Sequence, residues 1–127
     1  KTRSLGGTET ILLVEDDARV RKITQKILTG RGYTVLTADN GTKALDIIKN
    51  GKLTISLLLT DIIMPGMNGN TLFQRASEIR PGLRALYMSG YTDSVITQSD
   101  IHRENTAFIQ KPFTVDKLAA KIRQILD

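Results

Sequence analysis

Acidic residues directly follow two short apolar segments of this 127-residue chain. Glu15 and Asp16 come after residues 11–14, and Asp61 comes after residues 56–60. Both segments are short, apolar and rich in strand-forming residues, which predicts buried strands. Ligands bind at the carboxyl edge of an open parallel sheet, so these three carboxylates are expected to meet there. A cluster of carboxylates supplies the hard oxygen ligands that a magnesium ion takes.

Two further residues are expected at the same edge. Ser89 follows the apolar residues 86–88, and Lys111 follows residues 108–110. A bound cation together with Lys111 could neutralise a phosphoryl group, and the hydroxyl of Ser89 could hydrogen bond one of its oxygens. The sequence contains neither a GxGxxG nor a Walker A glycine loop to hold a nucleotide. A side chain is therefore the expected phosphoryl acceptor, and a carboxylate can act as that nucleophile.

The apolar segments alternate with amphipathic ones along the chain. Capping residues and glycines predict where the helices begin and end: Asp17, Asn40 and Thr114 precede three helices, and Gly30 and Asn50 lie where two of them end. A further helix is expected to end at Pro81, and a weaker pattern indicates one at 94–103. Strands are predicted at Thr10–Val14, Thr34–Ala38, 56–60, 85–88 and 107–109.

Five strands alternating with five helices predict an α/β fold, a (βα)5 doubly wound parallel sheet covered on both faces. Crossovers between parallel strands are right-handed, which leaves few topologies. The strand order 2-1-3-4-5 places the first and third strands side by side at the switch point. That order would bring Glu15, Asp16 and Asp61 into one crevice.

Composition narrows the possible functions. The length suits one domain, which we place at residues 10–127 after a linker at residues 1–9. The absence of cysteine excludes disulfides and thiolate sites, and His102 alone cannot build a histidine metal cluster. The net charge of +5 comes from scattered residues without interleaved aromatics, which argues against nucleic-acid binding. No apolar run is long enough to span a membrane and no signal peptide is evident, so this domain is expected to make no membrane contact.

Four segments together resemble the response-regulator receiver domains of two-component signalling. They are LVEDD at 13–17, LTDIIMPGMNG at 59–69, MSGY at 88–91 and QKPF at 110–113. They occur in the family's order and spacing, and the resemblance extends from about Thr10 to the end of the chain. It implies the flavodoxin-like fold of the family, in agreement with the predicted topology.

The resemblance also implies a role for each site residue. Asp61 matches the phosphoacceptor aspartate, and Lys111 matches the lysine that such domains use beside the phosphoryl group. The implied metal ligands, for Mg²⁺ or also Mn²⁺, are Asp16 directly, Glu15 through water, Asp61 and the backbone carbonyl of Ile63. Ser89 and Phe108 match the two switch positions. The remaining residues of interest are Asp17, interpreted as a helix cap, and Pro112, a proline often in cis linkage in this family.

The expected function is that of a phosphoacceptor. A histidine kinase or a histidine phosphotransfer domain would donate a phosphoryl group from phosphohistidine to Asp61. The new phosphate would attract Ser89, Phe108 would turn inward, and the face built by the fourth helix, the last strand and the last helix would change. Bulky residues at Ile63 and Tyr91 would screen the site from water, which predicts slow autodephosphorylation.

The sequence is compatible with two types of parent protein. The glycine-containing segment at residues 6–10, here called the lead-in, and residues 88–93 favour a receiver excised from the C-terminal end of a hybrid sensor histidine kinase. Such a receiver is expected in the cytoplasm, and its parent could be anchored in a membrane. A receiver of a stand-alone or effector-bearing response regulator is the alternative.

The domain alone is expected to be a stoichiometric acceptor and not a multiple-turnover enzyme. A magnesium-dependent phosphohydrolase usually carries a second acid two residues after its nucleophile, where this chain has Ile63. An interaction module with an inactive site was the third possibility, disfavoured because every residue needed for phosphorylation is present.

Overall fold

The structure is a computed structural model that describes residues 6–90 and 105–127. The expected helix at 94–103, the screening residue Tyr91 and the lone histidine His102 lie outside the described residues. Within the described residues, no helix is both long and apolar enough to cross a membrane.

Five parallel strands form one sheet in the order β2-β1-β3-β4-β5, which confirms the predicted topology. The first two predicted strands match their observed bounds, and the other three differ from prediction by about one residue at their ends. The strands are β1 (Thr10–Val14), β2 (Thr34–Ala38), β3 (Leu57–Asp61), β4 (Arg84–Ser89) and β5 (Thr106–Gln110).

Four helices connect or follow these strands in the described part of the chain: α1 (Ala18–Gly30), α2 (Gly41–Asn50), α3 (Gly69–Ile79) and α5 (Val115–Leu126). Side chains cap each of them as the sequence predicts for Asp17, Asn40 and Thr114, which accept hydrogen bonds from backbone N–H groups of the first turn. Asn68 caps α3 in the same way. Gly51 ends α2 in the left-handed conformation, with a φ of 69°.

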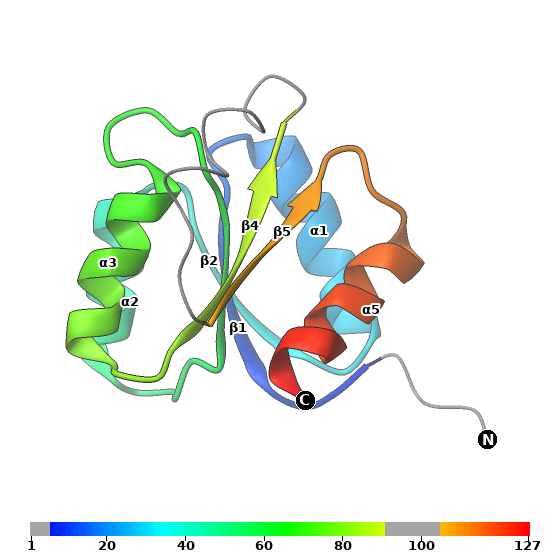
Figure 1. Ribbon diagram of the computed structural model, residues 1–127, viewed down its shortest axis with the longest axis horizontal. Helices are drawn as coiled ribbons and strands as arrows, with labels where there is room; N and C mark the ends of the chain where they lie inside the picture. Colours follow the sequence, from blue (N-terminus) through cyan, green and yellow to red (C-terminus); the bar gives the residue numbers. More distant parts are fainter. Residues whose placement is uncertain (1–5, 91–104) are drawn as a thin grey trace.

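The helices cover both faces of the sheet (Figure 1). Helices α2 and α3 lie on one face, and α1 and α5 lie on the other. Each face has its own apolar core, and alternate side chains of β1 and β3 contribute to both of them. Strand β3 is the central strand of the sheet and is buried along its whole length. Its last residue, Asp61, therefore lies at the middle of the carboxyl edge of the sheet.

Candidate functional site

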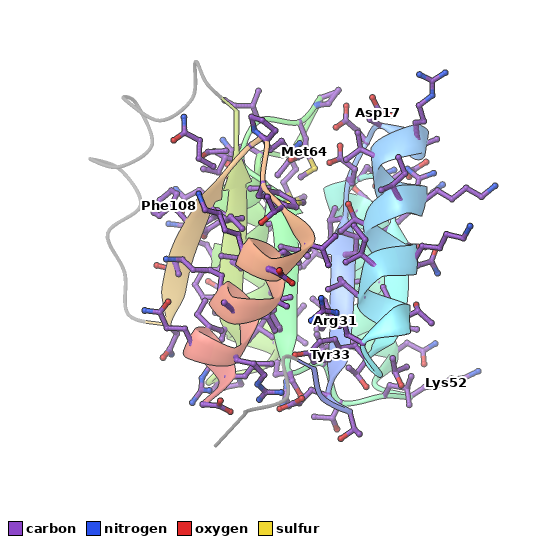
Figure 2. The ribbon with its side chains drawn as sticks, turned by 90° about the vertical axis from the view of Figure 1, so that its right-hand side faces the viewer. Asp17, Arg31, Tyr33, Lys52, Met64 and Phe108 are labelled. Atoms are coloured by element: carbon purple, nitrogen blue, oxygen red, sulfur yellow. The ribbon has the colours of Figure 1, made fainter. Side chains whose placement is uncertain are left out.

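Three carboxyl groups meet at the carboxyl edge of the sheet. Glu15 and Asp16 follow β1, Asp61 ends β3, and one carboxylate oxygen from each lies within 4.8 Å of the others. Glu15 and Asp61 are only 2% and 5% exposed, whereas Asp16 is exposed. In Figure 2, the neighbouring residue Asp17 marks this edge at the start of α1, and Tyr33 lies toward the opposite end of the sheet. The structure thus brings together the acids that the sequence predicted to converge.

Lys111 enters the same cluster from the end of β5. Its Nζ lies 2.6 Å from Oδ1 of Asp61 and 3.2 Å from Oε1 of Glu15. A single ammonium group therefore bridges the two buried carboxyl groups. The Lys111–Pro112 peptide bond is cis, as the resemblance suggested.

Burial and mutual repulsion make the two buried carboxyl groups titrate differently. Burial, reinforced by the hydrogen bond to Glu15, raises the pKa of Asp61 to about 8. Burial also acts to raise the pKa of Glu15, but hydrogen bonds from Asp61 and the Asp17 N–H and the charge of Lys111 outweigh it and leave that pKa lowered. The pKa of Lys111 is raised because its hydrogen bond to Asp61 and the nearby carboxylates outweigh the effect of its burial. Burial thus favours a proton on this acid pair, because two adjacent buried negative charges are costly.

The carboxyl cluster fits a divalent cation. Ligand oxygens around Mg²⁺ stand about 2.1 Å from the ion, so two of them are at most roughly 4 Å apart. The three carboxylate oxygens, within 4.8 Å of one another, need only a small adjustment to reach that spacing. A cation would also favour the ionised form of Asp61, because its positive charge offsets the burial and the neighbouring Glu15 that raise this pKa.

Ser89 and Ile63 lie at the ends of two neighbouring strands or just after them, β4 for Ser89 and β3 for Ile63. Ser89 is the last residue of β4 and is buried, with its carbonyl accepting a 2.8 Å hydrogen bond from the Lys111 N–H. Ile63 lies two residues after Asp61, and its side chain is 58% exposed. Ser89 lies at the strand end near which the sequence placed it, and Ile63 lies in the loop after β3. The roles of both residues remain predictions.

Phe108 lies farther from the acids, on the edge strand β5. Its ring packs against Tyr87 of β4 with ring centroids 5.5 Å apart, and Tyr87 meets Phe73 of α3 edge-on at 6.3 Å. Phe108 is half-buried and packs on the core beneath α2 and α3. Its expected turning motion remains a prediction.

The structure adds residues that sequence reasoning did not assign to the site. A Cβ on Gly69 would overlap the carbonyl of Asp61, and the Gly69 N–H donates a 2.7 Å hydrogen bond to Ile62. Only glycine lets the start of α3 approach the Asp61 backbone this closely. The Thr60 hydroxyl donates to the Asp61 carbonyl at 3.0 Å. Gly69 ends the MPGMNG segment, which was the available signal for its importance.

The doubly wound sheet has the flavodoxin-like strand order. Together with the carboxylate cluster and the lysine at its carboxyl edge, this fold is typical of phosphoacceptor domains. The chain belongs to the response regulator receiver domain family, whose model matches residues 11–123. It therefore takes the family's phosphoacceptor role in two-component signalling.

Individual relatives support the same assignment. The chain is 32% identical to sensor kinase CckA of Brucella abortus over all 127 residues, although it spans only 13% of that protein. It is 35% identical to the response regulator receiver protein CpdR of the same organism over 116 residues, which are 91% of this chain and 95% of CpdR.

Solved structures agree with the fold. The receiver domain of the hybrid histidine kinase CckA superposes with a TM-score of 0.79 at 32% identity, covering 93% of this chain and 99% of that one. A response regulator receiver protein from Sinorhizobium medicae gives a TM-score of 0.83 at 28% identity, covering 94% of each chain. These relatives include both kinase-linked and separate receivers, so the type of parent protein remains open.

Proposed function

We propose that Asp61 is the phosphoacceptor of this receiver. The observation that carries the proposal is the position of Asp61 at the end of a buried central strand, in contact with Lys111 and clustered with Glu15 and Asp16. A carboxyl group at this position lies at the sheet edge and is surrounded by groups that respond to added negative charge.

The transfer itself needs an ionised Asp61. An oxygen of the carboxylate attacks phosphorus in line, the bond from phosphorus to the imidazole nitrogen of phosphohistidine breaks, and its electron pair returns to that nitrogen. The product is an aspartyl phosphate. Since little covalent chemistry falls to the protein, positioning and charge stabilisation by the surrounding residues supply most of the rate.

Asp16, Glu15, Asp61 and the Ile63 carbonyl would hold Mg²⁺ in this proposal, and Mn²⁺ could substitute. The bound ion supplies positive charge beside the phosphoryl oxygens. Lys111, already 2.6 Å from Asp61, would move its hydrogen bonding from the free carboxylate to an oxygen of the phosphoryl group.

Ser89 and Phe108 would then carry the switch. The Ser89 hydroxyl is expected to bond the new phosphoryl group from the end of β4, and Phe108 to turn further toward Tyr87 on the neighbouring strand. The described residues of the affected face belong to β5 and α5. A beryllofluoride complex that left the Ser89 and Phe108 resonances unchanged would disprove this part.

The donor in this proposal is a histidine kinase or a histidine phosphotransfer domain, in the cytoplasm. A hybrid histidine kinase is the favoured parent because the similarity to CckA includes the lead-in as well as the receiver. The similarity to CpdR, which covers nearly all of that protein, supports the alternative of a separate response regulator.

The test is the intact mass of the chain after incubation with acetyl phosphate and Mg²⁺. We expect a gain of one phosphoryl group that disappears in Asp61→Asn and in the presence of a chelator. Labelling that persists in Asp61→Asn would show that another residue is the acceptor. Multiple turnover of a chromogenic phosphoester would instead favour a phosphohydrolase, a result that Ile63 in place of a second acid argues against.

A further inference from the structure

Arg21 makes a contact that links α1 to the acidic turn after β1. Its Nη1 donates a 2.8 Å hydrogen bond to the backbone carbonyl of Glu15. That carbonyl belongs to the peptide group that joins Glu15 to Asp16. The guanidinium group therefore restrains the orientation of the peptide plane between two of the three clustered acids. Arg21 itself is partly buried beside the turn.

Two further hydrogen bonds hold the same turn. The Glu15 N–H donates to the carbonyl of Ala38 on β2 at 3.1 Å, and the Asp17 N–H donates to Oε2 of Glu15 at 3.1 Å. The backbone is thus held on both sides of Asp16, whose own carboxylate is exposed. Because so little packing surrounds that carboxylate, its direction depends on the peptide that Arg21 holds.

We propose that Arg21 is a positioning residue of the phosphoacceptor site. Its guanidinium group orients the Glu15–Asp16 peptide so that both carboxylates point toward the cation. Partners of this kind, one step removed from the ligands, change metal affinity without touching the ion. The inference rests on the proposed function, because it assumes that these acids bind the ion that phosphorylation requires.

A purely electrostatic role for Arg21 makes the opposite prediction. A positive charge near the acids opposes cation binding, so removing the charge alone would strengthen binding. A positioning role predicts that removal weakens binding. The sign of the change therefore separates the two.

The experiment measures Mg²⁺ binding by calorimetry and amide exchange at Asp17 in the metal-free chain. Arg21→Met is expected to weaken Mg²⁺ binding about tenfold and to speed exchange, as the turn loosens. Arg21→Lys should recover part of both, since lysine can reach the carbonyl with one donor. Lys22→Met is the matched control, because Lys22 is exposed on the same helix and makes no side-chain hydrogen bond or ion pair within the described residues.

Unchanged or tighter Mg²⁺ binding by Arg21→Met would overturn the proposal, as would an equal loss in Lys22→Met. Should Arg21→Met fail to fold, Arg21→Lys decides: weaker binding with faster Asp17 exchange supports the proposal, and wild-type values for both overturn it. Failure of the wild-type chain to become labelled at Asp61 would refute the proposed function instead, and the metal-binding and exchange results would still stand.

Discussion

The two ends of the sheet carry ion networks of opposite character. At the carboxyl edge, Lys111 contacts two buried carboxyl groups, and burial raises the pKa of one of them, Asp61, to about 8. At the amino edge, Arg123 of α5 binds Glu9, just before β1, through 3.0 and 2.8 Å contacts, and Asp127 through a 2.8 Å contact.

The amino-edge network also includes a tyrosine and the lead-in backbone. Arg123 Nη1 donates to the hydroxyl of Tyr33 at 3.4 Å and to the carbonyl of Gly6 at 3.1 Å. The hydrogen bond from Arg123 lowers the pKa of Glu9, and the same contact raises the pKa of Arg123. Both partners thus favour their charged forms, as in a stabilising pair.

The two networks differ in how many carboxyl groups each basic side chain neutralises and in how deeply those groups are buried. Arg123 offers a planar fork that satisfies a carboxylate with two parallel hydrogen bonds, in a partly solvated place. Lys111 offers one point charge to two carboxyl groups that have lost most of their water. The amino-edge network therefore stabilises the fold, while the carboxyl-edge cluster retains unbalanced negative charge that a cation and a phosphoryl group can use.

Replacing the basic side chain at the centre of each network is expected to give the largest difference between the two edges. Lys111→Met is expected to slow labelling by acetyl phosphate about 100-fold, because the ammonium group stabilises charge on the transferring phosphoryl group. Arg123→Met should leave the labelling rate within about twofold, since Arg123 lies at the other edge. Intact mass against time measures both, and similar rates for Lys111→Met and the wild-type chain would break the comparison.

Stability should change with opposite signs at the two edges. Arg123→Met is expected to lower the free energy of unfolding by about 2 kcal/mol, because Glu9 and the Gly6 carbonyl lose their donor. Asp61→Asn should raise it at pH 7.5 without metal, since a buried amide is uncharged and needs no proton taken up on folding. Urea denaturation measures both changes. A destabilised Asp61→Asn would show that burying this carboxyl group does not cost stability.

The two networks also predict opposite pH dependences. The folded chain keeps a proton on Asp61 that the unfolded chain releases near 3.8, so this group's contribution is complete below that pH and is lost as pH rises through about 8. Glu9 has a lowered pKa, so its contribution is present above 4.5 and is lost as pH falls through the lowered value.

Denaturant unfolding between pH 3 and pH 9 with a chelator tests both signs. Asp61→Asn should flatten the decline in stability as pH rises from about 4 to about 8, and Glu9→Gln should reduce the decline as pH falls below 4.5. If Asp61→Asn leaves the decline between pH 4 and pH 8 unchanged, the proton is not held at this site.

Sequence reasoning found the carboxyl-edge network and missed the amino-edge one for a physical reason. Asp61 and Lys111 directly follow strands, so local pattern and sheet topology suffice to bring them together. Arg123 and Glu9 are 114 residues apart, and neither follows a recognisable signal. Their contact depends on how the end of α5 packs beside the start of β1, which hydrophobic periodicity does not specify.

The same limit applies to single residues at the site. Arg21 is one of the scattered basic residues of the sequence, and nothing in its spacing shows that it reaches the Glu15 carbonyl. The ends of β3, β4 and β5 differed from prediction because hydrogen bonding to neighbouring strands, more than composition, decides where a strand stops.

Substitutions of Gly6 and Gly7, in the segment before β1, test the amino-edge network through the smallest expected effects. The residues around Gly6 and Gly7 were predicted to be linker from their composition, yet the Gly7 N–H donates to the Arg31 carbonyl at 3.1 Å. A Cβ on Gly6 would overlap that backbone carbonyl, whereas a Cβ on Gly7 would overlap the ends of the Arg123 and Glu9 side chains and press on the edge of the Tyr33 ring.

Side-chain ends can move more cheaply than backbone, so Gly6→Ala should cost about 1 kcal/mol of stability and Gly7→Ala less. Gly30→Ala is the matched control, because a Cβ there meets nothing within 4 Å. Gly30 ends α1, where alanine is the better helix former, so this control should be neutral or stabilising. Equal stabilities for Gly6→Ala and Gly7→Ala would mean that the lead-in does not rest against α1 in solution, and that Arg123 holds Glu9 without it.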